Sequence, residues 1–476
     1  MFQLSKANNT IIMGSNMRQT KHRGPFQSVL VTTIFLAGLI SINATAADYF
    51  RLPEFSVPQG TTIIHAGTLL AVPGEAPGTR QSIIVRSGKI VEIREGYTQA
   101  ADIHAEGEVR IIDLSDRFVM PGFIDLHVHL SGQAGTGSRL DAVRMTDADI
   151  ALTAQMYARR TLLGGFTTVR DLGSRGTAIF ALRDAIRAGK IAGPKIIAAG
   201  ESITPTGGHG DVHGFRQEVL DVLPSTGVCD GADDCRAAVR RQVKRGADVI
   251  KVTATGGVLS ETATGTGQQF TDEELQVIAD TAHALGRKVT AHAHDKAGIE
   301  AALRAGFDSI EHAMWADKGT MKLFKETGAW MIPTVYPITA VGDTPEKMKQ
   351  GPFKDMPPPI MAKLLRLGRQ PKDMTRLAHS MGVKIALGTD SGVSPHGENA
   401  NEFIEYVNAG MSEMEALMTG TVNAAEAGGI SDRAGSIEPG KAADIVAMAQ
   451  SPLENISAVL RVQFIMRDGV VFKQSD

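Results

Sequence analysis

Eight short apolar runs that alternate with helical patterns constrain the fold of this chain most strongly. Each run has the length of a buried strand, and the eight are FIDLHVHL, TTVRDL, KIIAAG, DVIKVTA, KVTAHA, SIEHA, WMIPTVY and KIALGTD. Helical periodicity lies between them, at 147–164, 176–188, 233–245, 272–285 and 295–305. Eight β–α units within residues 119–428 predict an α/β protein, a (β/α)8 TIM barrel with its chemistry at the carboxyl ends of the strands.

Local signals for helix ends support this reading. Thr271 and Glu274 have the spacing of a capping box, which predicts a helix start at this point. Glycine follows several of the expected helices, where its left-handed conformation ends a helix without strain: Gly189, Gly246, Gly286, Gly306 and Gly328.

Both ends of the expected barrel are flanked by short alternating strands. Residues 60–118 contain TTIIHAGTLLAV, QSIIVRSGKIVEI and VRIIDLS. The same alternation of apolar and polar residues occurs near the end of the chain, in KAADIVAMA and FIMRDGV. We expect residues 47–118 and 429–476 to form one small β-sandwich domain built from both chain ends.

The first 46 residues read as a targeting segment. An apolar stretch of 14 residues at 29–42 follows Lys21 and Arg23, and Ala44-Thr45-Ala46 has the small residues of a cleavage site. The stretch is short for a bilayer span, so we expect a signal peptide at 1–46 and an exported mature protein that is free of the membrane. Met17 stands at an alternative start, and an uncleaved anchor is the other reading.

Charge and cysteine content exclude several classes of protein. Lys plus Arg is 49 and Asp plus Glu is 52, so the net charge of −3 gives no electrostatic basis for nucleic-acid binding. Only two cysteines occur, too few for a disulfide-built scaffold. Cys229 and Cys235 have five residues between them, and either a disulfide or two free thiols fits an exported chain.

Histidines and an aspartate fall at the ends of the expected strands. Alternation within a strand places His127 and His129 on one side, as a chelating pair at the barrel mouth. Asp390 ends the eighth strand, which neighbours the first in a closed barrel. His292 and His312 end the fifth and sixth strands. The sequence therefore predicts a metal site at this rim.

Lys251 lies in the apolar fourth strand, between these two sets of residues. Burial lowers the pKa of a lysine, and a neutral amine can add carbon dioxide to become a carbamate that spans two cations. The alternative is a lysine paired with an acidic neighbour.

An ordered set of motifs resembles the amidohydrolase superfamily over residues 60–475. These are PGFIDLHVHL, IKVTATGG, TAHAH, SIEHA, GTDSG and the closing GSIEPGKAADIVAM. They are most similar to a prolidase-like branch related to imidazolonepropionase, which includes Xaa-Pro dipeptidases, Xaa-Arg/Lys carboxypeptidases and ochratoxinase-like enzymes. The resemblance implies two divalent metal ions, with zinc expected. One would be held by His127, His129 and Asp390 and the other by His292 and His312, bridged by carboxylated Lys251.

The resemblance also implies hydrolysis of an amide, with release of a C-terminal amino acid from a dipeptide or an N-acyl amino acid, ochratoxin-type amides included. Asp390 would pass a proton from the attacking water to the departing amine. Relatives are often multimers, so a homo-oligomer is expected. One departure weakens the expectation of dipeptide specificity. Some dipeptidase relatives carry Tyr where this chain has Phe270, which has no hydroxyl to offer a substrate carboxylate.

Five further residues are candidates for substrate binding, each with packing or solvent exposure as the alternative: His209, His213, His294, Tyr336 and His396. Two other functions remain open. The centre could open a cyclic amide, as imidazolonepropionase does, although that branch is not expected to use the bridging lysine. A non-catalytic metal-binding relative is disfavoured because every expected ligand type is present.

Overall fold

The computed structural model describes residues 55–475, except 105–106, 136–137, 224, 261–264, 343, 349, 351–353, 355 and 368–369. The expected signal segment, 1–46, lies outside the described residues. Within the described part, no helix has the length and apolar character needed to cross a membrane.

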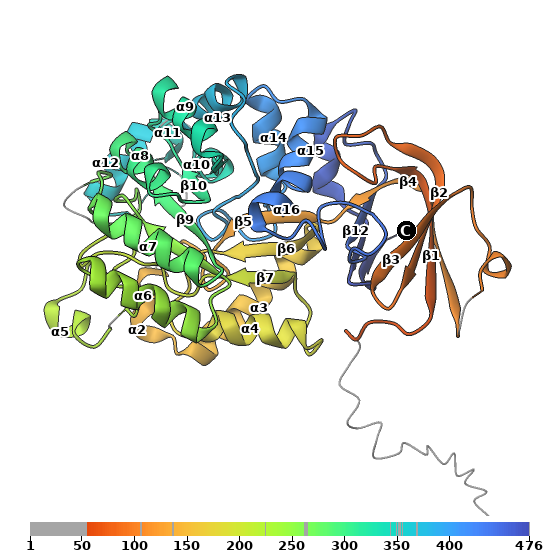
Figure 1. Ribbon diagram of the computed structural model, residues 1–476, viewed down its shortest axis with the longest axis horizontal. Helices are drawn as coiled ribbons and strands as arrows, with labels where there is room; N and C mark the ends of the chain where they lie inside the picture. The colour runs from red at the N-terminus through yellow and green to blue at the C-terminus, as the bar shows by residue number, and fades with distance from the viewer. Residues whose placement is uncertain are drawn as a thin grey trace, which may run out of the picture. The chain divides into compact units, whose positions relative to one another are not determined.

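Two parallel sheets form the centre of the α/β part (Figure 1). One contains β5 (Phe123–Val128), β6 (Phe166–Asp171) and β7 (Lys195–Ala198). The other contains β8 (Val249–Thr253), β9 (Lys288–Ala293), β10 (Ser309–His312) and β11 (Trp330–Ile332). Seven of the eight predicted strands are therefore confirmed, and every neighbouring pair is parallel.

Hydrogen bonds also connect the two sheets at both of their edges. Ile203, which follows β7, donates from its backbone N to Lys251 O on β8 (2.7 Å). At the other edge, Met331 N donates to Lys384 O (2.9 Å) and Leu126 N donates to Leu387 O (2.9 Å). Segment 384–390 therefore lies between β11 and β5.

The eighth predicted strand, at 384–390, is the exception. Its only ladder contact before Asp390 is an isolated bridge between Ile385 and Met331, within the described residues. The backbone leaves the extended region at Asp390, where φ is +50°. A Cβ at Gly388 would lie 2.4 Å from Ile332 Cγ2, so the segment passes too close to β11 for a side chain at that point.

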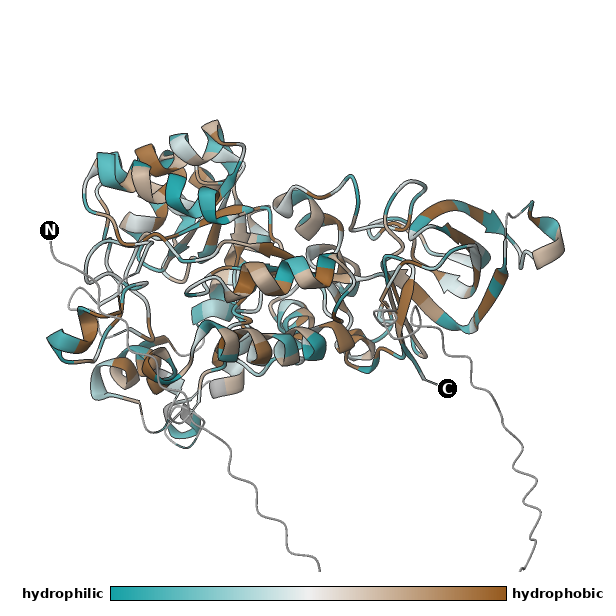
Figure 2. Ribbon diagram, turned by 90° about the horizontal axis from the view of Figure 1, so that it is seen from below, coloured by the Kyte–Doolittle hydropathy of each residue, from teal (hydrophilic) through white to brown (hydrophobic). Residues whose placement is uncertain are grey.

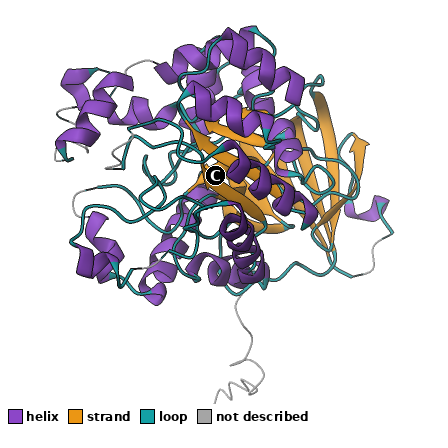
Figure 3. Ribbon diagram, turned by 60° about the vertical axis from the view of Figure 1, so that its left-hand side comes forward, coloured by secondary structure: helices purple, strands orange, loops and turns teal. Residues whose placement is uncertain are grey.

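Helices surround the strands of the two parallel sheets (Figure 3). They are α2 (Asp141–Arg144), α3 (Asp147–Leu163), α4 (Ala178–Arg187), α5 (Gln217–Leu220), α6 (Ala232–Arg245), α7 (Asp272–Ala284), α8 (Lys296–Arg304), α9 (Lys318–Thr327), α10 (Tyr336–Val341), α11 (Pro345–Met348), α12 (Pro358–Leu367), α13 (Gln370–Ser380), α14 (Asn401–Asn408), α15 (Glu413–Thr419) and α16 (Val422–Gly428). Short 3-10 turns occur at Ala100–Asp102, Ser138–Leu140 and Ile456–Arg461.

The helix signals of the sequence are confirmed. All five predicted helices form, with ends shifted by one or two residues. Thr271 Oγ1 accepts from Glu274 N, and Glu274 accepts from Thr271 N (2.8 Å), which completes the capping box. Gly246 and Gly328 end α6 and α9 with φ of +109° and +73°, values that favour glycine.

Strands from both ends of the described chain share one seven-stranded sheet. In spatial order they are β14 (Val470–Gln474), β13 (Phe464–Arg467), β12 (Ile445–Met448), β4 (Val109–Pro121), β1 (Thr61–Leu69), β2 (Gly78–Arg86) and β3 (Lys89–Glu95). Two separate stacked sheets were expected. The strands are joined because the long β4 pairs with β1 from Val109 to Val119 and with β12 from Phe118 to Pro121. Apolar positions recur along these strands (Figure 2) and bury their own core.

Cys229 and Cys235 form a disulfide, so the structure decides between the two readings of this pair. Both residues are buried, and the bond closes the turn that leads into α6. Closing this loop restricts the unfolded chain and so stabilises the fold.

Candidate active site

The predicted rim contains a pocket of about 330 Å³. It opens where β8, β9, β10 and segment 384–390 end. Residues from each of these elements line it together with the His-x-His pair that ends β5: His127, His129, Lys251, His292, His312 and Asp390. The six residues that the sequence singled out as ligands therefore share one cavity.

Asp390 faces the histidine pair of β5. Its Oδ1 lies 3.1 Å from His129 Nε2 and 3.5 Å from His127 Nε2. Burial disfavours the charge of Asp390, but the neighbouring His127 and the hydrogen bond from His129 outweigh it and lower the pKa of Asp390 to about 2. A carboxylate therefore stands beside two imidazoles at neutral pH.

Lys251 is buried, with 3% of its surface exposed. Its Nζ has no hydrogen-bond partner among the described residues. Burial lowers the pKa of Lys251 to about 8, against the carboxylates of Glu311 and Asp390, which act to raise it. A buried amine without a partner is costly, so this position calls for a group that the protein itself does not supply.

His292 and His312 lie on the other side of the cavity. Their ring centroids are 4.6 Å apart, and His312 Nδ1 lies 2.7 Å from Thr334 Oγ1. His292 Nε2 is buried without a hydrogen-bond partner in the described part. Burial holds the pKa of both rings well below the ordinary value, so they are neutral imidazoles with a lone pair to offer.

Two sets of donor atoms are close enough to hold a metal ion, each within 4.8 Å. One set is His127, His312 and Asp390, and the other is His292, His294 and His312. His294 was not among the predicted ligands, whereas the structure places it beside His292, with ring centroids 4.5 Å apart. His294 Nδ1 is also buried without a partner among described residues, and burial lowers the pKa of His294 to about 3.

Of the five candidates for substrate binding, His209 and His294 line the pocket. The ring of His209 lies 4.3 Å from that of His292, and burial lowers the pKa of His209 to about 3. A turn holds His209, because its backbone N donates to Gln269 Oε1 (2.9 Å).

The other three candidates do not line the pocket, because each is engaged with local partners. His213 Nε2 lies 2.6 Å from Gly208 O. The Tyr336 hydroxyl donates to Glu398 Oε2 (2.7 Å). His396 packs its ring on Tyr157 and places Nε2 2.8 Å from Gly132 O.

Sequence reasoning missed Glu311, a fully buried carboxylate beneath the pocket. Its Oε2 lies 2.8 Å from His127 Nδ1, and its Oε1 accepts from the Arg170 guanidinium (2.8 Å). Burial acts to raise the pKa of Glu311, but Arg170 and His127 lower it to about 2. His312 has a φ of +73°, so the usual alternation does not hold and neighbouring residues of β10 both face this cluster. An acidic residue inside the apolar run SIEHA was the available signal.

Asp125 was also missed, and it connects β5 to segment 384–390. Its Oδ1 accepts from His127 N (3.0 Å) and Thr389 N (3.1 Å), and its Oδ2 accepts from Asn399 Nδ2 (2.7 Å). These bonds fix the backbone at His127 and next to Asp390. Burial, opposed by the hydrogen bonds, raises the pKa of Asp125 to about 6.

Residues 118–472 match the model of the amidohydrolase family. The chain belongs to this family. It is 33% identical to ochratoxinase of Aspergillus niger over 439 residues, 87% of this chain and 86% of the relative. It is 25% identical to imidazolonepropionase of Solibacter usitatus over 423 residues, 79% and 88% of the two chains. A solved Xaa-Pro dipeptidase with bound methionine matches with a TM-score of 0.81 at 38% identity, over 87% of this chain and all of that one.

These similarities assign the amidohydrolase to the prolidase-like branch, whose members are hydrolases of C–N bonds. The family binds metal, and the described residues fit one. Neutral imidazoles and ionised carboxylates converge on one cavity. Several buried nitrogens there lack any partner among the described residues, including those of His292, His294 and Lys251. Divalent cations satisfy this set of donors.

Proposed function

We propose that this amidohydrolase cleaves the amide bond of a dipeptide or an N-acyl amino acid and releases a C-terminal amino acid. Ochratoxin-type amides belong to the same chemical class. The observation that carries the proposal is one cavity that contains a carboxylate, four histidines and a lysine whose Nζ has no partner among the described residues. These are Asp390, His127, His129, His292, His312 and Lys251. The 38% identical dipeptidase, described with methionine bound in its active site, supports a free amino acid as product.

The site would bind two divalent metal ions, and zinc is the expected element. His127, His129 and Asp390 would hold one ion, His292 and His312 the other, and carboxylated Lys251 would connect them. His294, which is grouped with His292 and His312, would be a further donor to the second ion. Bound cations supply a hydroxide nucleophile near neutral pH and polarise the scissile carbonyl.

The remaining chemistry belongs to the side chains. Asp390 is ionised and lies at the edge of the cavity, so its carboxylate can accept a proton from the attacking water and return it to the departing amine. His209 and His294 present neutral rings that can orient the substrate. Apolar side chains of one cluster also line the cavity and exclude water: Val258, Leu259, Met314, Ile338, Leu364 and Leu367.

Arg175 is the residue that we assign to the free carboxylate of the substrate. It lines the pocket and is half-buried. Its guanidinium donates to Leu223 O (3.2 Å) and forms no ion pair with any described residue. A guanidinium with free donors is suited to a bidentate contact with a carboxylate. Glu201, also in the pocket wall, is paired with Arg245 instead (3.2 Å).

For the scaffold, we propose that the two parallel sheets and segment 384–390 close into the expected (β/α)8 barrel. The hydrogen bonds from Ile203 to β8, and from segment 384–390 to β11 and β5, support closure. The small β domain would consist of 47–118 and 429–476, and the barrel of 119–428.

The amidohydrolase is also proposed to act after export. The Cys229–Cys235 disulfide supports this, because such bonds persist in oxidising compartments. The N-terminus of the mature chain tests the proposal, with a start near residue 47 as the expected result.

Self-association into a homo-oligomer is a further proposal. Leu152 and Val222 each expose 72% of their surface, and a subunit interface would cover such apolar side chains. Light scattering on the purified protein tests it, with a mass above one chain as the expected result.

A substrate panel tests the proposed function. Zinc-loaded protein is incubated with dipeptides, N-acyl amino acids and their C-terminally amidated forms, and free amino acid is measured. We expect release only from substrates with a free carboxylate, and loss of the activity after chelation. Cleavage of cyclic amides alone would contradict the proposal and favour the imidazolonepropionase type.

A further inference from the structure

A second cavity system lies at the opposite end of the parallel strands from the active site. Two pockets, of about 490 and 370 Å³, share the wall residues Arg187, Ile196, Ile197, Ile430 and Arg433. We call them together the basic groove. Its wall includes Lys288, the first residue of β9, whereas His292 is the fifth, which separates the two sites by about 13 Å along the strand.

Most cations of the groove are neutralised by the protein. Arg183 contacts Asp248 (2.7 Å), and Lys195 contacts both Asp444 (2.9 Å) and Asp468 (2.8 Å). Arg170 reaches the groove, but its guanidinium is bonded to Glu311. These pairs hold the fold together and leave no charge for a ligand.

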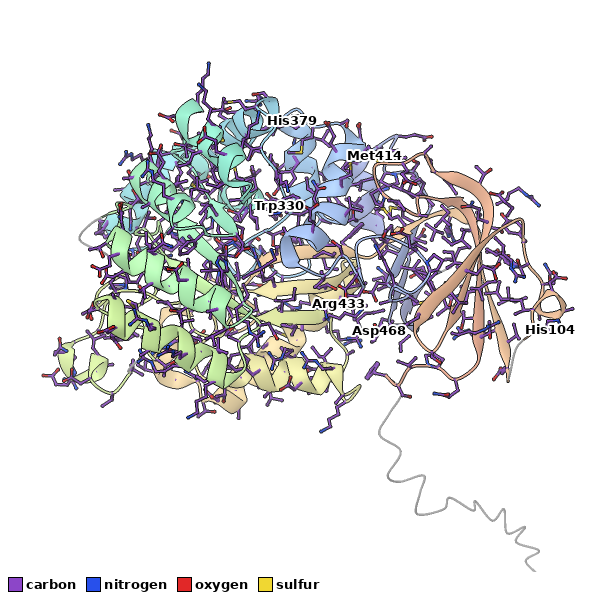
Figure 4. All side chains as sticks on the ribbon, viewed as in Figure 1. His104, Trp330, His379, Met414, Arg433 and Asp468 are labelled. Carbon is purple, nitrogen blue, oxygen red and sulfur yellow. A yellow bond between two sulfur atoms is a disulfide. The ribbon has the colours of Figure 1, made fainter. Side chains whose placement is uncertain are left out.

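Three arginines of the 370 Å³ pocket remain. Arg433 forms no ion pair with any described residue. It lines the same pocket as Asp468, which Figure 4 labels near it and whose carboxylate contacts Lys195 (2.8 Å). Arg287 also forms none in the described part, and its Nε is buried without a hydrogen-bond partner. Arg187 has only a 3.8 Å approach to Asp184, with both side chains exposed.

The three arginines come from separate elements, the end of α4, the turn before β9 and the loop after α16. All three line the same pocket, so one anion bound there would meet positive charge from three elements. The pocket has one carboxylate, Asp248, and it is occupied, because it also accepts from Ala198 N (3.0 Å). The pocket therefore has more guanidinium groups than carboxylates. The adjoining pocket of the groove adds Asp432 and Asp468, and Asp468 is paired with Lys195 (2.8 Å).

We propose that the basic groove binds a small molecule that carries a phosphate group. Guanidinium groups match the oxygens of phosphate in bidentate geometry, and two or three of them around one group give charge-assisted bonds. The pocket of about 370 Å³ has room for the rest of a phosphate monoester beside the anion. This site is independent of the proposed hydrolytic activity.

Calorimetric titration of the intact protein with inorganic phosphate tests the proposal. We expect one saturable site with a Kd tighter than about 1 mM, and Arg433→Ala and Arg287→Ala each to weaken it about tenfold. Arg433 is exposed, so its substitution leaves the fold intact, as circular dichroism would verify. Arg159→Ala, at an exposed arginine of α3 outside the groove, is the matched control and retains binding.

Two further measurements make the result specific. Chelation of the metal leaves phosphate binding unchanged, which separates the groove from the active site. Phenyl phosphate binds at least as tightly as phosphate, and succinate binds more weakly. The proposal is overturned by absence of saturable binding, by binding that survives both arginine substitutions, or by equal affinity for succinate.

Discussion

Glu311 Oε2 and His127 Nδ1 lie 2.8 Å apart, and both side chains are buried. A carboxylate at this nitrogen orients the imidazole and leaves its Nε2 directed toward Asp390. Arg170 neutralises the other oxygen of Glu311. The negative charge of Glu311 is therefore balanced by Arg170, and Glu311 holds the ring of His127 in place.

Glu311→Gln tests this arrangement. The substitution leaves the Arg170 guanidinium buried without its counter-charge, which we expect to lower the free energy of unfolding by about 3 kcal/mol. It also loosens His127, so metal affinity should fall about 10- to 100-fold. Urea unfolding and metal titration measure the two effects. Glu426→Gln removes an exposed ion pair with Lys384 and should cost under about 1 kcal/mol; a similar loss at both positions would contradict the role of Glu311.

Lys251→Ala removes the proposed bridging group. We expect the variant to retain far less metal and to lose most activity, because Lys251 carries the group that we assign to the bridge. Carbon-13 NMR after exchange with labelled bicarbonate should show a carbamate signal in the wild type and none in the variant. A variant with full activity and two bound ions would exclude the carbamate.

Asp390→Asn keeps the shape of the residue and an oxygen donor but removes the proton acceptor. The expected result is retained metal with kcat lowered about 100- to 10,000-fold. Metal analysis and turnover on the same preparation measure this. Near-normal turnover would remove the assignment of Asp390 as the group that transfers the proton.

The elements that could be predicted from the sequence are those that local patterns determine. Seven strands and five helices follow from hydrophobic periodicity, a capping box and glycine ends, which depend on residues a few positions apart. The six expected ligands share a cavity because parallel strands place their carboxyl ends at one rim.

The parts that could not be predicted depend on contacts between distant residues. Arg170 and Glu311 are 141 positions apart, so no local pattern indicates that these two side chains pair. The left-handed backbone at His312 and Asp390 breaks the strand alternation that sequence reasoning assumes. Loop paths decide that Tyr336 and His396 bond to Glu398 and Gly132 instead of lining the pocket.

Arg175→Ala should weaken recognition of the substrate carboxylate. A charge-assisted hydrogen bond contributes about 1.5–3 kcal/mol, so kcat/KM should fall about 10- to 100-fold, mostly through KM. Steady-state kinetics on one N-acyl amino acid and its C-terminal amide measure the effect, and the amide should respond little. Arg175→Lys should recover part of the loss. Arg216→Ala, at an exposed arginine that does not line the pocket, serves as control. An equal loss on acid and amide would assign Arg175 to the fold instead.

Glu402 on α14 predicts a pH dependence of stability. Its carboxyl is buried and accepts from Val335 N (2.6 Å) and Tyr336 N (2.7 Å). Burial, opposed by these two bonds, raises the pKa of Glu402 from 4.5 to about 8. A raised pKa means that the folded chain binds the proton more tightly than the unfolded chain, so the stabilisation is complete below pH 4.5 and is lost as pH rises through about 8.

As the pH rises from 4.5 to about 8, the protonated Glu402 carboxyl should contribute less and less to the free energy of unfolding of the wild type. Glu402→Gln has no group to titrate at this position, so it should lack this decrease. Urea unfolding at several pH values between about 5 and 8 measures the slope. Glu273→Gln, at an exposed position of α7, should keep the wild-type slope. Identical slopes for wild type and Glu402→Gln would show that the carboxyl is ionised in the folded protein throughout this range, held so by its two backbone donors.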